Sequence, residues 1–449
     1  MLSAESFWTD SLRTAPEGES ITRILAAAIR AVEPGEAAQR FVSRSDDNLV
    51  VAGRTYDLSA FGRVCLLGIG KASAAMADAL ADILGPRLEA GLIITKHTQT
   101  IHHFPLTILE SDHPVPGERS LQAGQKTLEL VSSLGPDDLL ICLISGGGSA
   151  LVTAPADGVT LADMQALTSV LLACGARIGE INTLRRRLDR VKGGGLVKLA
   201  NGATVVSLIL SDVVGNPLEA IASGPTAPDP TTRAEALAIL SKYHLEEQIP
   251  SSINHALSSS PETPKSGDPL FERVQNVIVG SNLIAAQAAL KQAEEEGFHP
   301  YLLRTDLQGE ARQAAFELST FLRQARLTGS PVPPPACIVA GGETTVTLSP
   351  NAGRGGRNTE LALAAVRELA DFPGVMLITL ATDGEDGPTD ATGAVVTGES
   401  YRRAGELGLW VEDFLDRHDS YSFFEKLGDL LKPGPTGTNV NDLVFLFSL

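Results

Sequence analysis

The residues with the clearest chemical potential form a glycine-rich stretch that follows a short apolar run. Leu139–Ile144 is apolar throughout, which is typical of a β-strand buried on both faces. The stretch itself reads Ser145, Gly146, Gly147, Gly148 and Ser149. Because adjacent glycines carry no side chains, successive backbone N–H groups can point at one anion, with two serine hydroxyls beside them. A tight turn would explain one such loop, but three more glycine-rich stretches with polar residues favour phosphate binding: Lys192–Gly195, Gly341–Thr344 and Arg354–Arg357.

A second candidate lies in the turn after another apolar run, Val64–Leu67. There Gly68, Ile69, Gly70 and Lys71 precede an alanine-rich helix that runs to about Leu84. An ammonium group at this point could meet a phosphate drawn to the helix N-terminus, although a solvated lysine is the simpler interpretation. The turn nearly matches the dinucleotide fingerprint, but Ser73 replaces its third glycine, and the next strand ends in Lys96 where an acid is expected.

Charged residues mark the remaining candidates. The segment Arg185–Lys192 is the strongest anion-attracting stretch, and we expect Lys192 to be functional and several of its arginines to be structural. Asp212 follows the buried strand Val205–Leu210, where a carboxylate could bind Mg²⁺ or a substrate hydroxyl, or cap a turn. Asp383 follows the strand Val375–Ala381 in the same way. Four histidines match no common zinc pattern and are interpreted as loop residues: His97, His102, His103 and His113.

Composition narrows the possible partners. The formal charge of −18 and a pI of about 4.9 argue against nucleic acid and anionic membranes, because a polyanion would be repelled over most of the surface. The four cysteines are far apart and form no Cys-x-x-Cys pair, which is a reduced, cytoplasmic pattern. The sequence shows neither a basic region followed by an apolar one at its start nor an apolar run as long as a membrane span.

The length of 449 residues predicts two domains. Strands and helices alternate along the chain, which predicts an α/β fold with a parallel sheet covered by helices on both faces. An amphipathic helix is expected over Ile21–Val32. The stretch Ser258–Pro269 is rich in Ser, Pro and Gly and is interpreted as the linker, which divides the chain into domains at 1–258 and 270–449.

Six motifs in order resemble the glycerate 2-kinase family, whose C-terminal part is called the MOFRL domain. The likeness covers nearly the whole chain, and six motifs are far more specific than a single glycine loop. They are Gly68–Ala72, Ser145–Leu151, Ser211–Asn216, Gly355–Asn358, Thr382–Asp390 and Thr436–Leu443. The resemblance implies a Rossmann-like, doubly wound N-terminal domain, a smaller C-terminal α/β domain, and a site in the interdomain cleft.

The same resemblance implies that the protein transfers phosphate from ATP to D-glycerate, giving 2-phosphoglycerate. It implies Lys71 and Arg357 as the catalytic residues. Phosphoryl transfer needs positioned donors, cations and a metal, and the chain supplies candidates for each. Arg354 is expected to assist Arg357 or to bind the glycerate carboxylate, and Asp212 and Asp383 are the candidates for Mg²⁺ or for the hydroxyl proton. The loop at Gly146–Ser149 would hold either a nucleotide phosphate or that carboxylate.

Two other functions stay open at this point. An NAD(P)-dependent hydroxypyruvate or glycerate reductase is motivated by the near-fingerprint at Gly68–Ser73 and by Lys96. A non-catalytic sensor of sugar acids or nucleotides would bind ligand without turnover. The partners expected are small molecules, D-glycerate and ATP, and the sequence leaves open whether the protein is a monomer or a homodimer.

Overall fold

The computed structural model describes residues 3–97 and 105–449. These residues form two compact units, which are described separately here. The central unit runs from Pro34 to Val279, and the terminal unit combines residues 3–33 with residues 280–449. The sequence-based division placed residues 1–33 with the first domain and the linker at Ser258–Pro269. The structural division differs at both places. That residues 1–258 and 270–449 are the independently folding domains stays a prediction.

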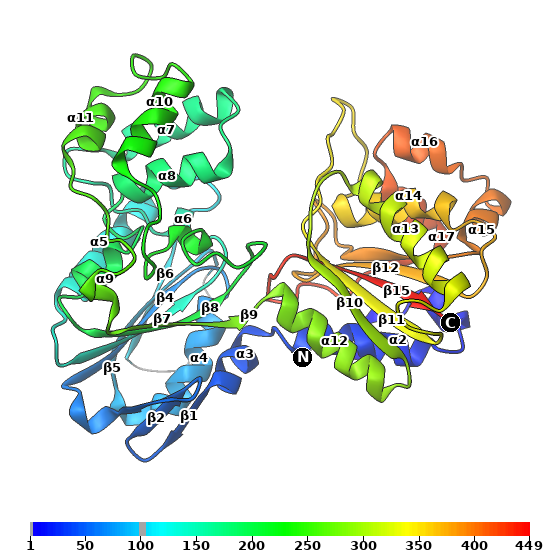
Figure 1. The fold of residues 1–449 in the computed structure, drawn as a ribbon, viewed down its shortest axis with the longest axis horizontal. Helices are drawn as coiled ribbons and strands as arrows, with labels where there is room; N and C mark the ends of the chain where they lie inside the picture. Colours follow the sequence, from blue (N-terminus) through cyan, green and yellow to red (C-terminus); the bar gives the residue numbers. More distant parts are fainter. Residues whose placement is uncertain (1–2, 98–104) are drawn as a thin grey trace. The chain divides into compact units, whose positions relative to one another are not determined.

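The central unit is built on a six-stranded sheet with the strand order β6-β5-β4-β7-β8-β9 (Figure 1). The strands from β6 to β8 in this order are parallel. Their bounds are β4 Arg63–Ile69, β5 Leu88–Thr95, β6 Leu106–Glu110, β7 Asp138–Ile144, β8 Thr204–Leu210 and β9 Val274–Gly280. A separate antiparallel sheet contains β1 Val42–Ser45, β2 Asn48–Val51 and β3 Arg54–Asp57.

Helices cover both faces of this sheet, as the alternating pattern predicted. The helices of the central unit are α3 Pro34–Phe41, α4 Ser73–Leu84, α5 Glu118–Ser132, α6 Gly148–Leu151, α7 Leu161–Ala173, α8 Ile178–Leu188, α9 Gly195–Leu199, α10 Arg233–Lys242 and α11 Ser251–Ser259. In Figure 1, α4 lies on one face of the sheet and α5 and α9 lie on the other. Every residue of β7 is buried, because both of its faces are covered. The helices α7, α8, α10 and α11 pack into a cluster with its own apolar core.

The place of one strand and of the linker differs from the sequence prediction. Val277–Gly280 follows the predicted linker and was therefore expected in the second domain, but it is part of β9, which pairs beside β8 in the central sheet. The predicted linker is also attached to the central unit, where Thr263 Oγ1 donates to Asp229 Oδ2 at 2.8 Å. A strand that completes a sheet belongs to that sheet's core, so the division falls after β9 and not at the stretch rich in Ser, Pro and Gly.

The terminal unit contains a mixed sheet with the order β10-β11-β15-β12-β13-β14. Its strands are β10 His299–Leu307, β11 Ala336–Gly342, β12 Val375–Ala381, β13 Gly393–Thr397, β14 Leu430–Leu431 and β15 Asp442–Ser448. Its helices are α1 Asp10–Thr14, α2 Gly18–Arg30, α12 Asn282–Glu295, α13 Ala311–Thr328, α14 Arg357–Glu368, α15 Ser400–Glu406, α16 Val411–Asp416 and α17 Ser420–Leu427. Among the described residues of this sheet, β10 and β11 pair in parallel and the other neighbouring strands pair antiparallel.

The predicted amphipathic helix is α2, and its apolar face explains why the first residues belong to the terminal unit. Ile21, Ile24 and Leu25 are fully buried in that unit, where α2 packs against α12 (Figure 1). Arg23 binds Glu296, just beyond α12, through two hydrogen bonds of 2.6 and 2.7 Å. The backbone N–H of Ser11 also donates to the buried Asp429 at 2.8 Å. Sequence periodicity predicts a buried face but not the partner that buries it.

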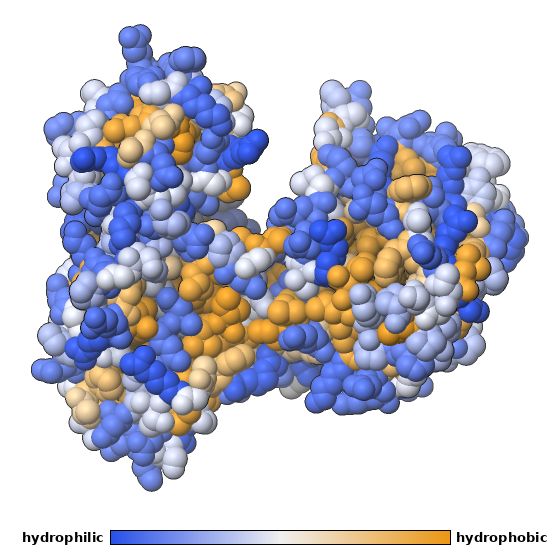
Figure 2. Space-filling view, viewed as in Figure 1, coloured by the Kyte–Doolittle hydropathy of each residue, from blue (hydrophilic) through white to orange (hydrophobic). Residues whose placement is uncertain are grey.

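The surface seen in Figure 2 is mostly hydrophilic on each unit, with apolar areas between the polar residues. In the part of the chain that the structure describes, no helix is both long and apolar enough to cross a membrane. The cysteines Cys65, Cys142 and Cys337 are buried and unbridged, and burial raises the pKa of Cys65 to about 11 and that of Cys142 to about 12. These thiols therefore stay protonated and act as small apolar core groups.

Candidate active site

The two glycine turns predicted from sequence lie side by side at the carboxyl ends of β4 and β7. The backbone N–H of Lys71 donates to Gly146 O at 3.0 Å, and the N–H of Ala72 donates to Ser145 Oγ at 3.0 Å. The N–H of Ser145 in turn donates to Ile69 O, also at 3.0 Å. Neighbouring parallel strands end at one edge of the sheet, so their loops become a single surface. We call this surface, Gly70–Ala72 with Ser145–Ser149, the glycine-loop site.

Close approach explains why glycine occupies three positions of this site. A Cβ on Gly70, whose φ is +135°, would overlap Ser145, and a Cβ on Gly146 would overlap Asp212 Oδ2. Gly147 has φ +84°, and a Cβ there would lie 3.0 Å from the ring of His113 and 3.4 Å from Lys71 Cε. The loop is thus packed tightly against a carboxylate on one side and against two basic side chains on the other.

The electrostatics of the glycine-loop site favour an anion. Lys71 is exposed, and it forms no ion pair with any residue that the structure describes. His113 lies beside it, and its burial, with the nearby Lys71 and Lys96, lowers the pKa of its imidazole to about 4. His113 is therefore neutral at pH 7 and has one N–H to donate and one nitrogen that accepts. From the sequence, His113 was predicted to be an ordinary loop residue.

The serines of the loop are used differently from each other. Ser145 is 1% exposed, and its Oγ accepts the hydrogen bond from Ala72 that ties the two turns together. Ser149 Oγ lies 2.8 Å from Ser223 Oγ and is partly exposed. The backbone N–H groups of Gly146 and Gly147 donate to no other described residue, whereas that of Gly148 donates to Ser145 O at 3.4 Å. Two N–H groups and one hydroxyl thus remain for a ligand.

Lys192 is placed differently from the sequence expectation. Its side chain is 4% exposed, its Nζ forms an ion pair with the buried Asp189, and it donates to Val152 O at 2.9 Å. The neighbouring cations are also paired: Arg186 Nε lies 2.8 Å from Asp229, and Arg187 Nη2 lies 2.5 Å from Glu262. A buried and compensated ammonium is part of the core, because any ligand would first have to displace its carboxylate. These contacts are structural, and a functional role for Lys192 stays a prediction.

The second group of candidates lies at one edge of the sheet in the terminal unit. Because β15 is antiparallel to β11 and β12, its first residue lies opposite the last residues of both strands. This pairing places Asp442 next to Gly342 and Ala381, and so near Glu343, which follows β11. Arg357, the first residue of α14, binds both carboxylates. We call Glu343, Arg357 and Asp442 the Arg357 site.

The contacts of Arg357 are short and well formed. Nε lies 2.5 Å from Asp442 Oδ2 and Nη2 lies 3.2 Å from Asp442 Oδ1, while Nη1 lies 2.9 Å from Glu343 Oε1. Burial raises the pKa of Asp442 to about 6, and the nearby Arg357 opposes that rise. The carboxylates in turn raise the pKa of Arg357 above its usual value, although burial opposes this.

Other residues fix the helix that carries Arg357. Asp386 accepts hydrogen bonds from the backbone N–H groups of Asn358 and Thr359, at 2.9 and 2.8 Å, and so caps α14. A cavity of about 570 Å³ opens beside Arg357 and is lined by the glycines Gly353, Gly355 and Gly356 and by residues that include Thr344, Thr345, Glu360 and His418. The guanidinium therefore has a rigid base and faces a space that a small ligand could enter.

Arg354 and Asp383 lie in the terminal unit as well. The guanidinium of Arg354 is exposed and lies over the ring of Tyr421, 4.1 Å from its centroid. Asp383 follows β12, and its Oδ1 accepts from the backbone N–H of Glu385 at 3.2 Å. Lys71, Asp212 and the glycine loop lie in the central unit. The candidates thus fall into two groups, one in each unit.

The predicted metal ligands, Asp212 and Asp383, fit Mg²⁺ only if a single carboxylate binds the ion together with substrate and water. Within the described ranges, no three His, Cys, Asp or Glu side chains form a cluster that could hold a metal. Asp212 and Asp383 belong to different units, so neither unit presents both of them. Magnesium is often bound through one or two carboxylates, with substrate phosphates and water completing its shell. A single aspartate at a strand end suits that mode, and an all-protein cage does not.

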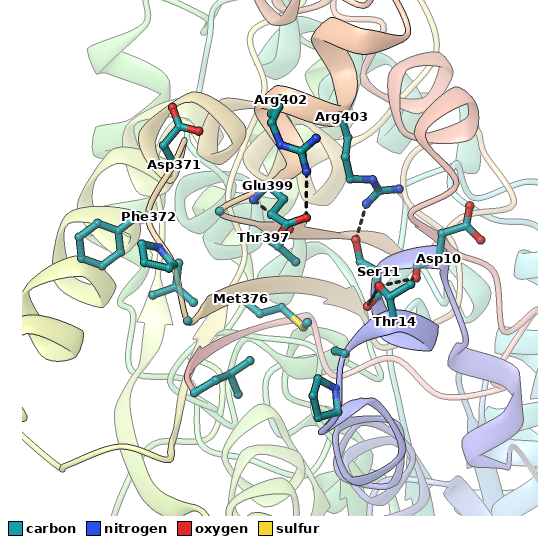
Figure 3. A pocket seen from close by; sticks show the side chains of 17 residues that line it. Asp10, Ser11, Thr14, Asp371, Phe372, Met376, Thr397, Glu399, Arg402 and Arg403 are labelled. Atoms are coloured by element: carbon teal, nitrogen blue, oxygen red, sulfur yellow. Dashed lines mark hydrogen bonds and ion pairs between the residues drawn. The ribbon is translucent and has the colours of Figure 1, made fainter.

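A larger cavity, of about 650 Å³, lies elsewhere in the terminal unit (Figure 3). Two arginines line it, but both are compensated by neighbours. Arg403 donates to Ser11 Oγ at 2.6 Å and to Asp429 at 2.8 Å, and Arg402 binds Glu399 at 3.2 Å and Glu406 at 2.6 Å. None of the residues predicted from sequence to be functional lies there. Its size alone does not make it the reaction site.

Comparison with known proteins gives the family. Residues 20–258 match a family described as a domain of unknown function, DUF4147, and residues 336–442 match the MOFRL family. The glycerate 2-kinase of Pyrococcus horikoshii is 40% identical over 94% of this chain and 95% of its own. The chain belongs to the glycerate kinase family. The crystal structure of the glycerate kinase of Thermotoga maritima, at 37% identity, covers 95% of this chain and 98% of its own with a TM-score of 0.86.

Family membership confirms the resemblance and the two-domain α/β fold predicted from the six motifs. Two relatives have a different name: putative hydroxypyruvate reductases of Agrobacterium vitis are 43% and 40% identical over 85% of this chain, and the match covers 86% and 98% of their own lengths. The reductase considered from sequence therefore has a counterpart among the relatives. The near-fingerprint itself is altered, since Ser73 Oγ donates to Gly70 O at 2.8 Å and fills the place of the third glycine.

Sequence reasoning missed four residues that the structure places in these sites. Glu343 and Asp442 bind Arg357, Asp386 caps its helix, and His113 packs against the glycine loop. His113 had an available signal, because it follows β6, a parallel strand whose carboxyl end shares an edge with β4 and β7. His102 and His103 lie outside the described residues. Asp442 gave no comparable signal, because its partner Arg357 is 85 positions away in the sequence.

Proposed function

We propose that this chain is a kinase that uses ATP to phosphorylate D-glycerate, with 2-phosphoglycerate as the product. The observation that carries the proposal is the exposed Lys71 at the N-terminus of α4, between two glycine turns. Backbone N–H groups and the helix dipole make this point electropositive, so a cation is unfavourable there unless an anion binds. The substrate is inferred from the names of the relatives, and phosphate binding is inferred from the chemistry of the glycine-loop site.

The reaction is a transfer of the terminal phosphoryl group. The 2-hydroxyl oxygen of glycerate bonds to the γ-phosphorus as the bond from phosphorus to the leaving ADP oxygen breaks, and the hydroxyl proton passes to a base. Lys71 and the N–H groups of Gly146 and Gly147 would hold an anionic group, either a nucleotide phosphate or the glycerate carboxylate. Arg357 would stabilise charge on the transferring oxygens through a rigid pair of donors.

The roles of the other predicted residues follow from their chemistry. Ser149 offers a hydroxyl beside the loop, and Arg354 would assist Arg357 or bind a carboxylate. Asp212 and Asp383 would accept the hydroxyl proton or hold Mg²⁺, whose charge would offset that of the phosphates when it is bound. Cytoplasmic location and a monomeric or homodimeric state stay predictions, and light scattering on the purified protein would measure the latter.

The decisive experiment incubates the purified protein with ATP, Mg²⁺ and D-glycerate. ADP release gives the rate, and phosphorus NMR identifies the product. A 2-phosphoglycerate signal is expected. A 3-phosphoglycerate signal would keep the kinase and refute its regiochemistry, whereas no ADP release with any small hydroxy acid would refute the kinase.

A second candidate is a reductase of hydroxypyruvate, favoured by the two relatives that bear that name. It would transfer hydride from NAD(P)H to the ketone carbon, and a proton to the oxygen. The altered fingerprint at Ser73 and the absence of an acid directly after β5 argue against dinucleotide binding. Loss of nicotinamide absorbance with hydroxypyruvate, in the absence of ATP, would favour the reductase over the kinase.

A further inference from the structure

The guanidinium of Arg357 offers two edges to carboxylates, and the structure fills them unequally. Asp442 takes the edge formed by Nε and Nη2 with both of its oxygens, at 2.5 and 3.2 Å. Glu343 takes Nη1 with one oxygen, at 2.9 Å. A paired contact fixes the plane of a guanidinium, whereas a single contact leaves it free to accept a different partner.

Exposure separates the two carboxylates further. The side chain of Asp442 is 8% exposed, and its backbone is the first residue of β15, paired on both sides with β11 and β12. The side chain of Glu343 is 44% exposed and follows the end of β11. An ion pair that is half in water contributes little, because water screens it, so Glu343 can be displaced at low cost. Displacing Asp442 would leave a buried charge without its partner.

The charges around Arg357 explain why Glu343 has to leave before a further anion can bind. One guanidinium faces two carboxylates, and a third, Asp386, lies at the start of α14 and also acts on the pKa of Arg357. This surrounding is net negative, so a further anion would be repelled while Glu343 stays on Nη1. The cavity of about 570 Å³ lies on this side, since both Glu343 and Arg357 line it, and Asp442 is not among its lining residues.

We propose that Nη1 of Arg357 is the position that receives a substrate oxyanion, that Glu343 occupies it until that anion arrives, and that Asp442 is the positioning residue that aims the guanidinium. The oxyanion is either the carboxylate of the hydroxy acid or the terminal phosphoryl group of the nucleotide. The inference rests on the proposed function, because it assigns Arg357 to the substrate of that reaction. It adds an exchange of carboxylate for substrate at a defined nitrogen.

The first test is Glu343→Gln, which removes the competing charge and keeps the size of the side chain. Steady-state kinetics would measure the KM for D-glycerate and for ATP separately. The KM of one substrate should fall by about two- to fivefold, which is the range of an exposed ion pair. The substrate whose KM falls is the one that supplies the oxyanion. An unchanged or raised KM for both would overturn the inference.

Glu412→Gln is the matched control. Glu412 is a half-exposed glutamate paired with Arg367 at 3.5 Å in the same unit, remote in sequence from Glu343. It should leave both KM values unchanged. If it lowers them as Glu343→Gln does, the effect is one of net charge, and the exchange at Nη1 is refuted.

The second test is Asp442→Asn, which should lower kcat about tenfold or more while KM changes less, because the guanidinium loses its aim. If Asp442 had only a structural role, the substitution would lower the melting temperature, and the protein that stays folded would keep its normal kcat and KM. A folded Asp442→Asn protein with normal kcat would refute the positioning role. If the variant does not fold, the Glu343→Gln kinetics decide alone, since that residue is half exposed.

Binding of inorganic phosphate, measured by calorimetry, separates failure of this inference from failure of the proposed function. Phosphate should bind the Glu343→Gln protein about two- to fivefold more tightly than the unmodified protein, without any turnover. Tighter phosphate binding in a protein that releases no ADP would refute the kinase but support the anion position. Normal kinase activity with no change in phosphate affinity or in either KM would refute the inference and leave the kinase standing.

Discussion

Lys71 and Arg357 are held in opposite ways by the units that carry them. Lys71 is exposed, has no ion-pair partner among the described residues, and is surrounded by backbone and by a neutral His113. Arg357 is clamped by Asp442 and also meets Glu343. The flexible lysine can follow an anion as it moves, whereas the arginine is aimed before any ligand arrives. One site thus depends on charge, and the other depends on geometry.

The sharpest test of this contrast exchanges the two kinds of cation. Arg357→Lys keeps the charge but loses the fork of donors that binds Asp442 and Glu343 together. We expect kcat to fall by about a hundredfold or more, which is less than the roughly 10³- to 10⁵-fold contribution of an arginine that stabilises a phosphoryl transition state, because lysine keeps the charge. Rates of ADP release, with melting curves to check folding, would measure it. Activity within about threefold of the unmodified protein would refute the idea that the fixed geometry of the arginine side chain is what the reaction requires.

The lysine should be less demanding. Lys71→Ala should lower kcat by about a hundredfold, as loss of one charged donor does, whereas Lys71→Arg should retain activity within about tenfold because its side chain has room to move. The same assay applies, with ATP affinity measured in parallel. Equal losses in both variants would show that Lys71 is as strictly positioned as Arg357, and the contrast would fail.

The packing of the glycine loop should matter less than either cation. In Gly146→Ala the new methyl group would overlap Asp212 Oδ2, and overpacking of this kind costs about 1–3 kcal/mol. We expect kcat/KM to fall about tenfold as the loop and the carboxylate move apart. Gly179→Ala is the control, because nothing lies within 4 Å of a Cβ there and it sits in α8. Equal activity of the two variants would show that the close contact is unimportant.

The smallest expected effect is on the stability of the protein at acidic pH. His113 stays neutral in the folded protein down to about pH 4, whereas in the unfolded chain it binds a proton below about pH 6.5. Between these values the unfolded chain binds more protons, so His113 makes stability fall as the pH falls. His113→Asn should therefore lose roughly 2 °C less in Tm than the unmodified protein between pH 6.5 and pH 4.5. Parallel melting curves would contradict the depressed pKa.

The strands and turns that carry these sites were predictable, because their signals are local. Leu139–Ile144 is apolar at every position, and it forms β7 with Asp138 added. Glycines after a buried strand mark a loop at the edge of the sheet, and parallel strands bring such loops together. The adjacency of Lys71 and Gly146 follows from these two facts, even though the residues are 75 positions apart.

The partners of charged residues were not predictable, because they depend on pairing between distant strands. Arg357 meets Asp442 only since β15 runs antiparallel to β11 and β12, and nothing in the residues near either one encodes that register. The ion pair of Lys192 was unpredictable for a related reason. Its neighbouring glycines suggested a ligand, but Asp189, three positions earlier, reaches its ammonium once the segment is buried.

The position of β15 in its sheet sets the order in which the protein can be completed during synthesis. This strand lies between β11 and β12, yet the ribosome makes it after every other strand of that sheet. The central unit, by contrast, has all of its strands by residue 280, so it can fold while the remainder is still being translated. Until β15 arrives, β11 and β12 each have an edge without its partner strand. The nascent terminal unit is therefore the part that chaperones would need to protect from aggregation.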